Sequence, residues 1–255
     1  MNKSKIEWCT YTWSPVTGCL HGCEYCYARK IADRFGCKTK HGEVFIQEKP
    51  FRYEDNDCET GEIIRGPIIP YPFGFEPTFH RYRLDEPSLK TKPQTIFVCS
   101  MADLFGDWVP DEWIEAVFNA CENAPQHRYL FLTKNPKRYQ KLYEQKAFPY
   151  LNNFWFGSTI TKPSDEYHWF EKTPYHQFVS IEPLLEPFGM INGEHFPEWV
   201  IIGAETGNRK DKVVPKAEWI TEITAECDRQ KIPVFMKNSL VPIVGEANMR
   251  REFPW

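Results

Sequence analysis

The stretch TIFVCSMAD, Thr95–Asp103, is a short apolar run that ends in polar residues. Near-continuous apolar runs of this length are typical of strands buried on both faces, as in a parallel sheet. IEWCTYTW, Ile6–Trp13, is a further candidate for the first strand. Five more segments share the plan of the first: RYLFLTK (Arg128–Lys134), FWFGST (Phe154–Thr159), QFVSIEP (Gln177–Pro183), WVIIGAE (Trp199–Glu205) and IPVFMKN (Ile232–Asn238).

Helical patterns lie between some of these strands. In Val109–Ala124, Pro110 stands where a first helical turn tolerates proline, and apolar residues then recur at helical spacing. Val214–Gln230 has the same pattern, with Pro215 followed by apolar residues at helical spacing. Strands that alternate with helices favour βαβ units and a parallel sheet. Because six or seven units are too few for an eightfold barrel, we expect an α/β fold of the partial (β/α)6 type, an open TIM-like barrel. A doubly wound open sheet is the alternative.

The segment Gly36–Thr91 interrupts the alternation. It is rich in proline and charge, as in GPIIPYPFGFEPTFHRYRLDEP, and it is too long for a simple loop. We therefore expect a single domain over residues 1–255, with residues 36–91 inserted after the first helix as a lid over one mouth of the sheet. A surface excursion without a role at the site is the alternative.

Polar residues at the strand ends predict a pocket. In parallel α/β sheets the active site lies at the carboxyl ends of the strands. One polar residue at a strand end is ordinary, whereas a complete set of them is typical of a lined cavity. The set is Ser100, Asp103, Lys134, Ser158, Thr159, Glu182, Glu205 and Lys237.

Composition limits the class of protein. The 31 basic and 35 acidic residues give a net charge of −4, which provides no global electrostatic case for nucleic-acid binding. No stretch is long enough to cross a bilayer, and MNKSKIEWCT lacks the apolar run of a secretory signal. We therefore expect a cytoplasmic protein with no membrane partner. In that compartment the nine cysteines fit thiols or metal ligands better than disulfides.

The stretch TGCLHGCEYCYARKIADRF, Thr17–Phe35, holds Cys19, Cys23 and Cys26 ahead of a helical run. Thiolates bind soft metals and iron–sulfur clusters. A four-iron cluster normally takes four cysteines, so three would leave one iron open to an exogenous molecule. A structural zinc site also needs four ligands. The fourth zinc ligand would be Cys9, His21, Cys37 or a distant residue.

The C-x3-C-x2-C spacing, with Tyr25 just before the last cysteine, resembles the cluster motif of the radical S-adenosylmethionine (radical SAM) superfamily. The wider chain is similar to an uncharacterised, phage- and prophage-associated family within that group. The resemblance implies that Cys19, Cys23 and Cys26 bind three irons of a [4Fe-4S] cluster, and that SAM chelates the fourth. It runs almost end to end through TWSPVTGC, CYARKIADRF, PTFHRYRLDEP, SMADLFGDWVPDEWI, LTKNPKRY, SIEPLL and VIIGAETG.

The implied reaction is reductive cleavage of SAM. An electron from the reduced cluster would break the sulfonium C–S bond, and the 5′-deoxyadenosyl radical would take a hydrogen atom from the substrate. A flavodoxin or ferredoxin is the implied electron donor. The substrate is open between a nucleic acid or nucleotide, a peptide and a small metabolite. Three basic segments fit phosphate groups: Thr133–Lys141, His80–Arg83 and Asn208–Lys212.

The resemblance gives candidate cofactor-binding roles to five residues. We expect Asp103 to accept hydrogen bonds from the ammonium of SAM and Tyr25 to contact its adenine. Ser158 and Glu182 are candidates for the ribose hydroxyls or the surroundings of the carboxylate. Glu205 is a candidate for the adenine or the substrate. Ordinary packing is the alternative for Tyr25.

Three further residues are candidate catalytic groups. Lys134 and Lys237 would bind an anionic group of the substrate or the cofactor carboxylate, and surface lysines at strand ends are the alternative. Cys99 would donate a hydrogen atom to a substrate radical. Its alternative is a small buried apolar side chain.

Two alternatives to an enzyme come from other classes. One is a zinc-stabilised binding module that holds the metal by the three cysteines and one further ligand. The other is an iron–sulfur protein that transfers electrons or senses redox state without cleaving a cofactor. Metal content and nucleoside formation distinguish all three.

Overall fold

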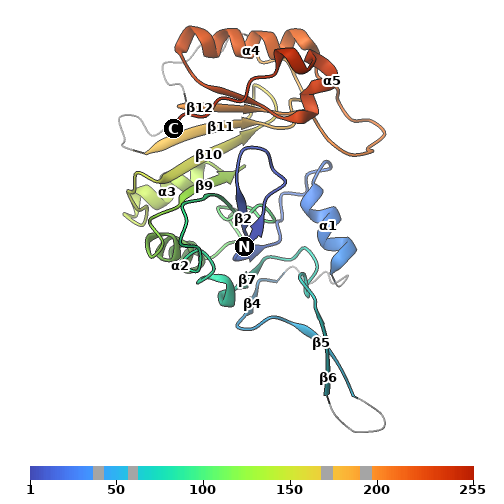
Figure 1. Cartoon of the computed structure of the whole chain (residues 1–255), viewed down its shortest axis with the longest axis vertical. Coiled ribbons are helices and arrows are strands. Elements are labelled where there is room, and N and C mark those ends of the chain that lie inside the picture. Colours follow the sequence, from blue (N-terminus) through green and yellow to red (C-terminus); the bar gives the residue numbers. More distant parts are fainter. Residues whose placement is uncertain (37–42, 57–62, 168–174, 190–196) are drawn as a thin grey trace.

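The computed structural model has a mixed α/β fold built around one large sheet (Figure 1). It describes residues 1–36, 43–56, 63–167, 175–189 and 197–255. β1 pairs with β2 antiparallel, and the remaining neighbours in the sheet pair parallel. The strands, in spatial order, are β1 (Asn2–Lys3), β2 (Tyr11–Trp13), β8 (Thr95–Val98), β9 (Arg128–Thr133), β10 (Phe154–Ile160), β11 (His176–Ile181), β12 (Trp199–Ile202) and β13 (Val234–Met236).

The strand order excludes one of the two expected architectures, the doubly wound sheet. Each of the six apolar runs forms a strand, which confirms the prediction of a largely parallel sheet. Only Tyr11–Trp13 of the proposed first strand is extended, because Ile6–Cys9 lie in the turn between β1 and β2. The described strands follow one another in chain order without the reversal that a doubly wound sheet requires, so that alternative is wrong. The described sheet ends at β1 and β13 and does not close.

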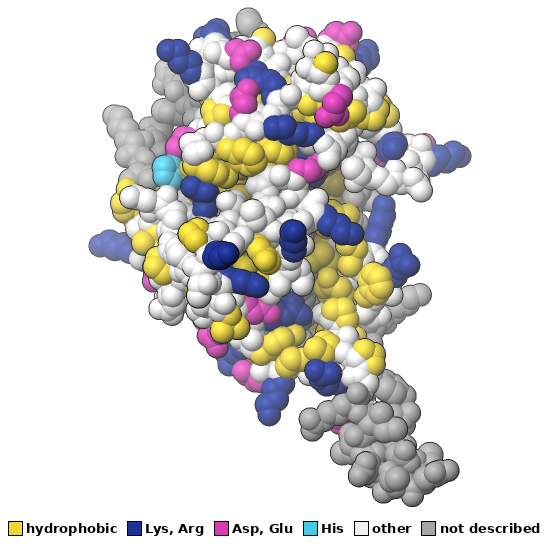
Figure 2. Space-filling view, viewed as in Figure 1, with side chains coloured by type: hydrophobic (Ala, Val, Ile, Leu, Met, Phe, Trp, Pro, Cys, Tyr) yellow, Lys and Arg dark blue, Asp and Glu magenta, His cyan; other side chains and the backbone are white. Residues whose placement is uncertain are grey.

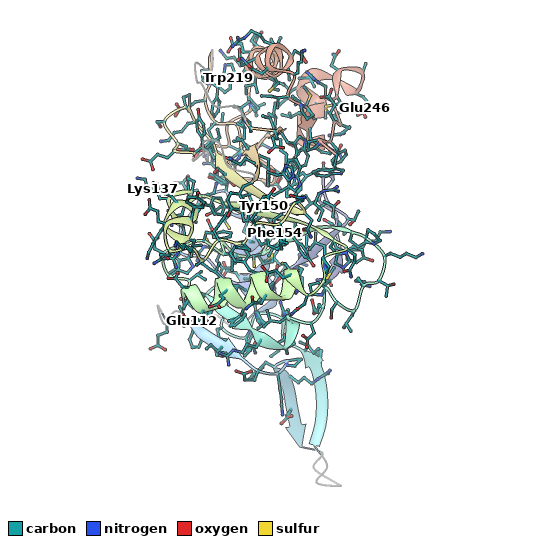
Figure 3. The ribbon with its side chains drawn as sticks, turned by 90° about the vertical axis from the view of Figure 1, so that its left-hand side faces the viewer. Glu112, Lys137, Tyr150, Phe154, Trp219 and Glu246 are labelled. Carbon is teal, nitrogen blue, oxygen red and sulfur yellow. The ribbon has the colours of Figure 1, made fainter. Side chains whose placement is uncertain are left out.

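Helices cover one face of this sheet. α2 (Asp111–Glu122) and α4 (Ala217–Gln230) confirm the two predicted helices, with Pro110 at the N-cap of α2. α3 (Lys137–Glu144) follows β9. Figure 3 shows this side of the molecule, with Glu112 in α2, Lys137 in α3 and Trp219 in α4. Two further helices complete the described α-helices: α1 (Tyr27–Phe35) and α5 (Val241–Val244). No described helix is both long and apolar enough to span a membrane.

Successive side chains along each strand point to opposite faces of the sheet. In β11, Val179 and Ile181 pack with Ile223 of α4. Phe178, which directly precedes Val179 and points the opposite way, packs on the other face. That second face carries a layer of mostly aromatic side chains: Trp8, Phe97, Leu130, Trp155, Phe178, Trp199, Ile201 and Phe235.

The turn between β1 and β2 covers this aromatic layer. The Trp8 ring centroid lies 4.7 Å from that of Phe97. The side chain of Glu7 accepts a hydrogen bond of 2.8 Å from the backbone N–H of Asn238, which follows β13. The turn therefore spans the face from one side of the sheet to the other.

The segment over residues 36–91 contains strands of its own. β5 (Arg52–Asn56) and β6 (Ile63–Ile68) form a hairpin that projects away from the large sheet in Figure 1. β7 (Thr78–His80) lies between β3 (Val16–Thr17) and β4 (Phe45–Gln47). Residues 37–42 and 57–62 of this segment, Cys37 among them, are outside the described residues. The described insertion therefore supports the chain directly before Cys19.

His80 of β7 is completely buried in that small sheet. Its Nε2 lies 2.8 Å from Thr17 Oγ1. Burial, with the charge of nearby Arg83 adding to it, lowers the pKa of His80 from 6.5 to about 3. His80 is therefore neutral in the folded protein at every pH above about 3.

We expect stability to fall as the pH drops below about 6.5. The unfolded chain takes up a proton on His80 near that pH, whereas the folded protein does so only near pH 3. At pH 5 the difference is about 2 kcal/mol of lost unfolding free energy. Urea unfolding at pH 7 and pH 5 measures it, and His80→Gln should reduce the difference by about that amount. An equal difference in both proteins would contradict the prediction.

Candidate functional site

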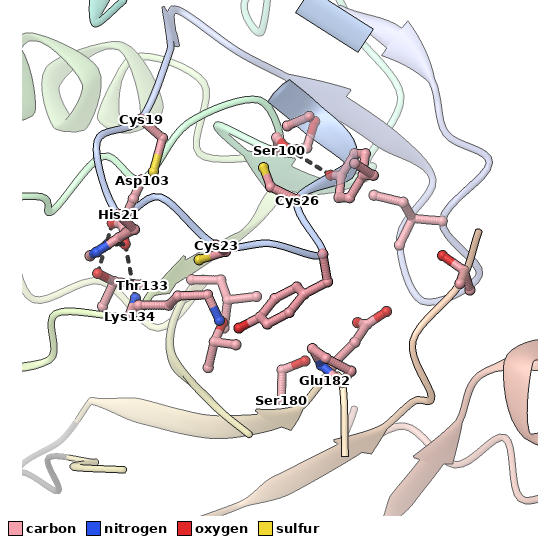
Figure 4. Close-up of a pocket in the computed structure, with 18 of the residues that line it drawn as sticks. Cys19, His21, Cys23, Cys26, Ser100, Asp103, Thr133, Lys134, Ser180 and Glu182 are labelled. Atoms are coloured by element: carbon pink, nitrogen blue, oxygen red, sulfur yellow. Dashed lines mark hydrogen bonds and ion pairs between the residues drawn. The ribbon is translucent and has the colours of Figure 1, made fainter. Parts of the chain in front are cut away.

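A cavity of about 370 Å³ lies at the carboxyl ends of the parallel strands, beside the cysteine loop (Figure 4). Cys19, Cys23 and Cys26 all line it. So does every residue of the predicted strand-end set except Ser158. Tyr25 also lines the cavity, and Phe75 contributes to it from the inserted segment. The structure thus brings the cysteines and the strand-end polar groups together around one space.

Two predicted site residues lie outside the described lining of the cavity. Ser158 is buried on β10, and since neighbouring strand residues face opposite sides, Thr159 faces the cavity instead. Cys99 is buried in the core on the helical side, with Trp113 of α2 in the same cluster. Burial raises the pKa of the Cys99 thiol to about 12. Neither residue is among those that line the cavity, so their expected roles at the cofactor or substrate gain no support from its lining.

The cysteine loop is held at both ends. The backbone N–H of Cys19 donates to Phe75 O at 3.2 Å. Cys26 caps α1, since its Sγ accepts a 3.3 Å hydrogen bond from the backbone N–H of Arg29. The Arg29 guanidinium in turn donates to Cys19 O at 3.0 Å. Helix formation therefore fixes the distance between the first and last cysteines of the loop.

Asp103 anchors the loop to the sheet from the other side. Its Oδ2 lies 2.7 Å from His21 Nε2 and accepts from the backbone N–H of Lys134 at 2.9 Å. Its Oδ1 accepts from Thr133 Oγ1 at 2.7 Å and from the backbone N–H of Phe105 at 3.0 Å. A carboxylate offers about four acceptor positions, and protein groups occupy them all. These contacts give Asp103 an anchoring role, and the expectation that it accepts hydrogen bonds from the ammonium of SAM stays a prediction.

We expect Asp103→Asn to lower the free energy of unfolding by about 2 kcal/mol, because the amide turns an N–H donor towards protein donors. For a chain of this size that corresponds to a melting temperature roughly 6 °C lower. Asp107→Asn is the matched control, since Asp107 accepts only from the Asn135 side chain at the exposed surface among the described contacts. Calorimetry of the metal-free proteins measures both. Equal melting temperatures for the two variants would contradict the anchoring role.

The other acidic groups of the cavity are paired with cations. Glu182 forms an ion pair with Lys237. Glu205, whose carboxylate is almost wholly buried, receives two hydrogen bonds of 2.8 Å from Arg209. The hydrogen bond from Arg209 lowers the pKa of Glu205. Both carboxylates are therefore neutralised by a neighbour before any ligand binds.

Lys134 is the cation of the cavity that forms no ion pair among the described residues. Its Nζ lies 5.3 Å from the centroid of the Tyr25 ring, as expected for a cation–π contact. Burial lowers the pKa of Lys134. A cation in this setting gains more from an anionic ligand than an exposed lysine does, because less water screens it.

Two residues that line the cavity each contain a buried polar atom without a hydrogen-bond partner among the described residues. The atoms are Nε1 of Trp8 and Oγ of Ser180. The sequence analysis missed both residues. A sequence signal could have identified Ser180, because it lies on β11 two positions before Glu182, which directly follows the strand, and alternate residues of an extended chain share a face. No sequence pattern places Trp8 at the cavity, because its position depends on the turn between β1 and β2.

The three thiols line the cavity without forming a group that could hold one metal ion. Among the described residues, no three His, Cys, Asp or Glu side chains are grouped in that way. In a four-iron cluster each thiolate binds a different iron, and the sulfurs need not converge. Burial raises the pKa of Cys19 to about 12. Metal binding would therefore release a proton from Cys19.

The three basic segments are largely engaged within the protein. Arg138 is buried and paired with Asp111, and Lys137 pairs with Glu166. His80 is buried, as described above, and Arg209 binds Glu205. Figure 2 shows acidic and basic side chains interspersed over the displayed face. Arg138, His80 and Arg209 are therefore structural, and they do not support the predicted phosphate contacts.

Comparison with known proteins gives a family but no activity. Residues 3–240 match the model of a family described as a protein of unknown function (DUF5131). No curated protein and no solved structure matches the chain. The matched region contains the cysteine loop and every residue of the strand-end set. The chain therefore belongs to the DUF5131 family.

Proposed function

We propose that the protein is a radical SAM enzyme whose Cys19, Cys23 and Cys26 bind a [4Fe-4S] cluster. The observation that carries the proposal is that these three thiols of one loop line the same cavity as the strand-end polar groups. No fourth cysteine is among the described lining residues. When bound, the cluster supplies the electron that cleaves the C–S bond of SAM.

The residues of the cavity fit a small polar cofactor. Lys134 offers a cation for a carboxylate, and Tyr25 offers an aromatic face beside it. Apolar walls from Phe75 and neighbouring residues exclude water, which protects a reactive species from side reactions.

We extend the proposal to the shape of the sheet, as a partial TIM-like barrel. Sequential strand order and helices on one face support it. The aromatic layer on the other face would then be the filled interior. The hydrogen bond from Asn238 to Glu7, which connects the two sides of the sheet, also supports it.

Anaerobic reconstitution with ferrous iron and sulfide tests the proposed function. The protein should bind about four irons per chain. With dithionite and SAM, it should then form 5′-deoxyadenosine, detected by chromatography. A reduced flavodoxin or ferredoxin should replace dithionite as electron donor. Stoichiometric zinc without iron uptake would favour the binding module. A cluster without nucleoside formation would favour the redox protein.

A further inference from the structure

α1 has the reverse of the usual arrangement of an amphipathic helix. A surface helix normally turns its large apolar side chains towards the core. The buried side chains of α1 are instead small, Ala28 and Ala32, and they pack with Phe75 of the inserted segment. Its large apolar side chains are the exposed ones: Tyr27 (49%), Ile31 (36%) and Phe35 (54%). Exposed apolar side chains that gather on one face are typical of an interaction site.

This apolar stripe of α1, formed by Tyr27, Ile31 and Phe35, begins at the cavity. Tyr27 directly follows Cys26, the N-cap of the helix, and it lines the cavity. The Tyr27 hydroxyl donates to Ser100 O at 2.7 Å, so the part of Tyr27 that is open to a partner is its ring. Residues four apart share one face of a helix. The stripe therefore runs from the cavity to Phe35, about 12 Å along the helix.

Basic side chains flank the apolar stripe. Lys30 and Arg34 are exposed, and their spacing of three and seven residues from Tyr27 places them on the same face. Asp33 lies on another side of the helix, because successive residues are rotated by about 100°. Figure 2 shows hydrophobic side chains over the position of α1, with Lys and Arg side chains beside them. The chain carries a net charge of −4, whereas α1 has three basic residues and one acidic residue.

The loop after β12 brings further cations to this edge of the cavity. Arg209 pairs with Glu205 and, at 3.3 Å, with Glu24 of the cysteine loop. The hydrogen bond from Arg209 lowers the pKa of Glu205, and the charges of Lys30 and Lys212 add to this effect. Lys30 and Lys212 are therefore both close enough to act on the same carboxylate. An acidic partner would be attracted to this edge although the whole chain is acidic.

We propose that the apolar stripe of α1, with Lys30 and Arg34, is the docking surface for a small acidic protein that carries single electrons. This inference rests on the proposed function, which consumes one electron for each SAM molecule that is cleaved. Electron transfer slows steeply with distance, and α1 begins at Cys26, so a carrier on this face would lie beside the cysteine loop. The carrier would lose one electron, and [4Fe-4S]2+ would gain it to become [4Fe-4S]+.

The size of this face also fits a transient redox partner. It consists of one side of a helix of nine residues. Complexes between redox partners are among the smallest protein interfaces, whereas the interface of a permanent dimer is several times larger. A second copy of the chain is therefore the less favoured occupant. Its presence would be seen as a dimer in solution.

Calorimetric titration of the full-length, metal-free protein with oxidised flavodoxin, and in parallel with oxidised plant-type ferredoxin, tests the docking surface. At least one carrier should bind saturably, and the binding should weaken as salt is added. Lys30→Glu should weaken that binding about tenfold, equal to roughly 1.4 kcal/mol, and should reduce its salt dependence. Ile31→Gln should weaken the binding severalfold and keep the salt dependence, because it removes apolar contact without changing the charge.

Each variant has a matched control away from α1. Lys141→Glu reverses an exposed charge on α3, which lies on the other side of the molecule in Figure 1. Leu89→Gln replaces an apolar side chain that is 76% exposed. Both controls should bind the carrier like the wild type. All four variants should melt at the wild-type temperature, because exposed substitutions rarely change stability.

Reduction of the reconstituted protein supplies a second readout. At low carrier concentration, the reduced carrier should bleach the cluster absorbance about tenfold more slowly in Lys30→Glu than in Lys141→Glu. Equal rates in these two variants would overturn the proposal. The titration itself needs no cluster and no SAM. Its failure is therefore distinguishable from failure of the proposed function, which is read out as 5′-deoxyadenosine formation with dithionite.

Four further results would overturn the docking surface. Neither carrier binds, or Lys30→Glu and Ile31→Gln both bind like the wild type. In the third, ovalbumin, an acidic protein without a redox centre, binds as tightly as the carrier, which would leave only non-specific attraction between charges. In the fourth, the wild type is a dimer in solution that Ile31→Gln dissociates, which would assign the stripe to a second copy of the chain.

Discussion

Replacing Cys23 by alanine is expected to abolish 5′-deoxyadenosine formation and to lower iron binding sharply. The variant retains only two of the three thiolates, and too few ligands remain to hold a four-iron cluster. Substitution of Cys23 tests metal binding with less effect on folding than substitution of Cys19 or Cys26 would have. Cys26 caps α1 through Arg29, so its loss would also destabilise the helix by about 1 kcal/mol. Cys19 is bound into the loop through its backbone to Phe75.

Cys9→Ala is the matched control for this prediction. Cys9 is a half-buried thiol outside the trio, and its Sγ lies 3.1 Å from Ser4 Oγ. It is also a sequence candidate for the fourth ligand of a zinc site. We expect Cys9→Ala to keep both iron and product, measured by iron assay and chromatography. Product from Cys23→Ala at the wild-type level would contradict the cluster, and loss of metal from Cys9→Ala would favour the zinc module.

Local sequence patterns predict the sheet because its strands are short and apolar throughout. The same property conceals which face each residue occupies. In β10, Phe154 and Phe156 face the helices while Trp155 faces the aromatic layer, so both faces are apolar. Without polar alternation, nothing in the sequence shows that Thr159 lines the cavity and Ser158 does not. For a strand buried on both faces, the side that each residue faces can be assigned only when the elements packed against each face are known.

Long-range contacts account for the rest of what sequence analysis missed. β3 pairs with β7, which is separated from it by about sixty residues that include the inserted hairpin. No local signal marks that pairing. Asp103 illustrates the functional consequence, since its position at a strand end predicts a free carboxylate. Its acceptors are filled by His21 and Thr133, which come from two other segments of the chain.

The largest expected structural effect follows from Gly18, directly before the first cysteine of the loop. Its φ is +87°, a conformation that costs other residues about 1–2 kcal/mol. A Cβ at this position would lie 2.1 Å from Glu76 O and 2.7 Å from Pro77 N, both backbone atoms of the inserted segment. Gly18→Ala must therefore separate the cysteine loop from the strand that supports it. We expect a total loss of about 4 kcal/mol, since overpacking adds roughly 1–3 kcal/mol to the conformational cost.

Gly22→Ala is the control that separates the steric clash expected at Gly18 from the conformational cost of a positive φ. Gly22 lies in the same loop with φ of +70°, and a Cβ there would meet no atom within 4 Å. It should therefore lose only the conformational cost of about 1–2 kcal/mol. Thermal unfolding of the two metal-free variants measures the difference, expected to be roughly 5–10 °C. Iron uptake should be much lower in Gly18→Ala than in Gly22→Ala, because displacement of Cys19 removes one ligand from its place. Equal melting temperatures and equal iron uptake in the two variants would show that contact between the loop and the insertion does not position the first cysteine.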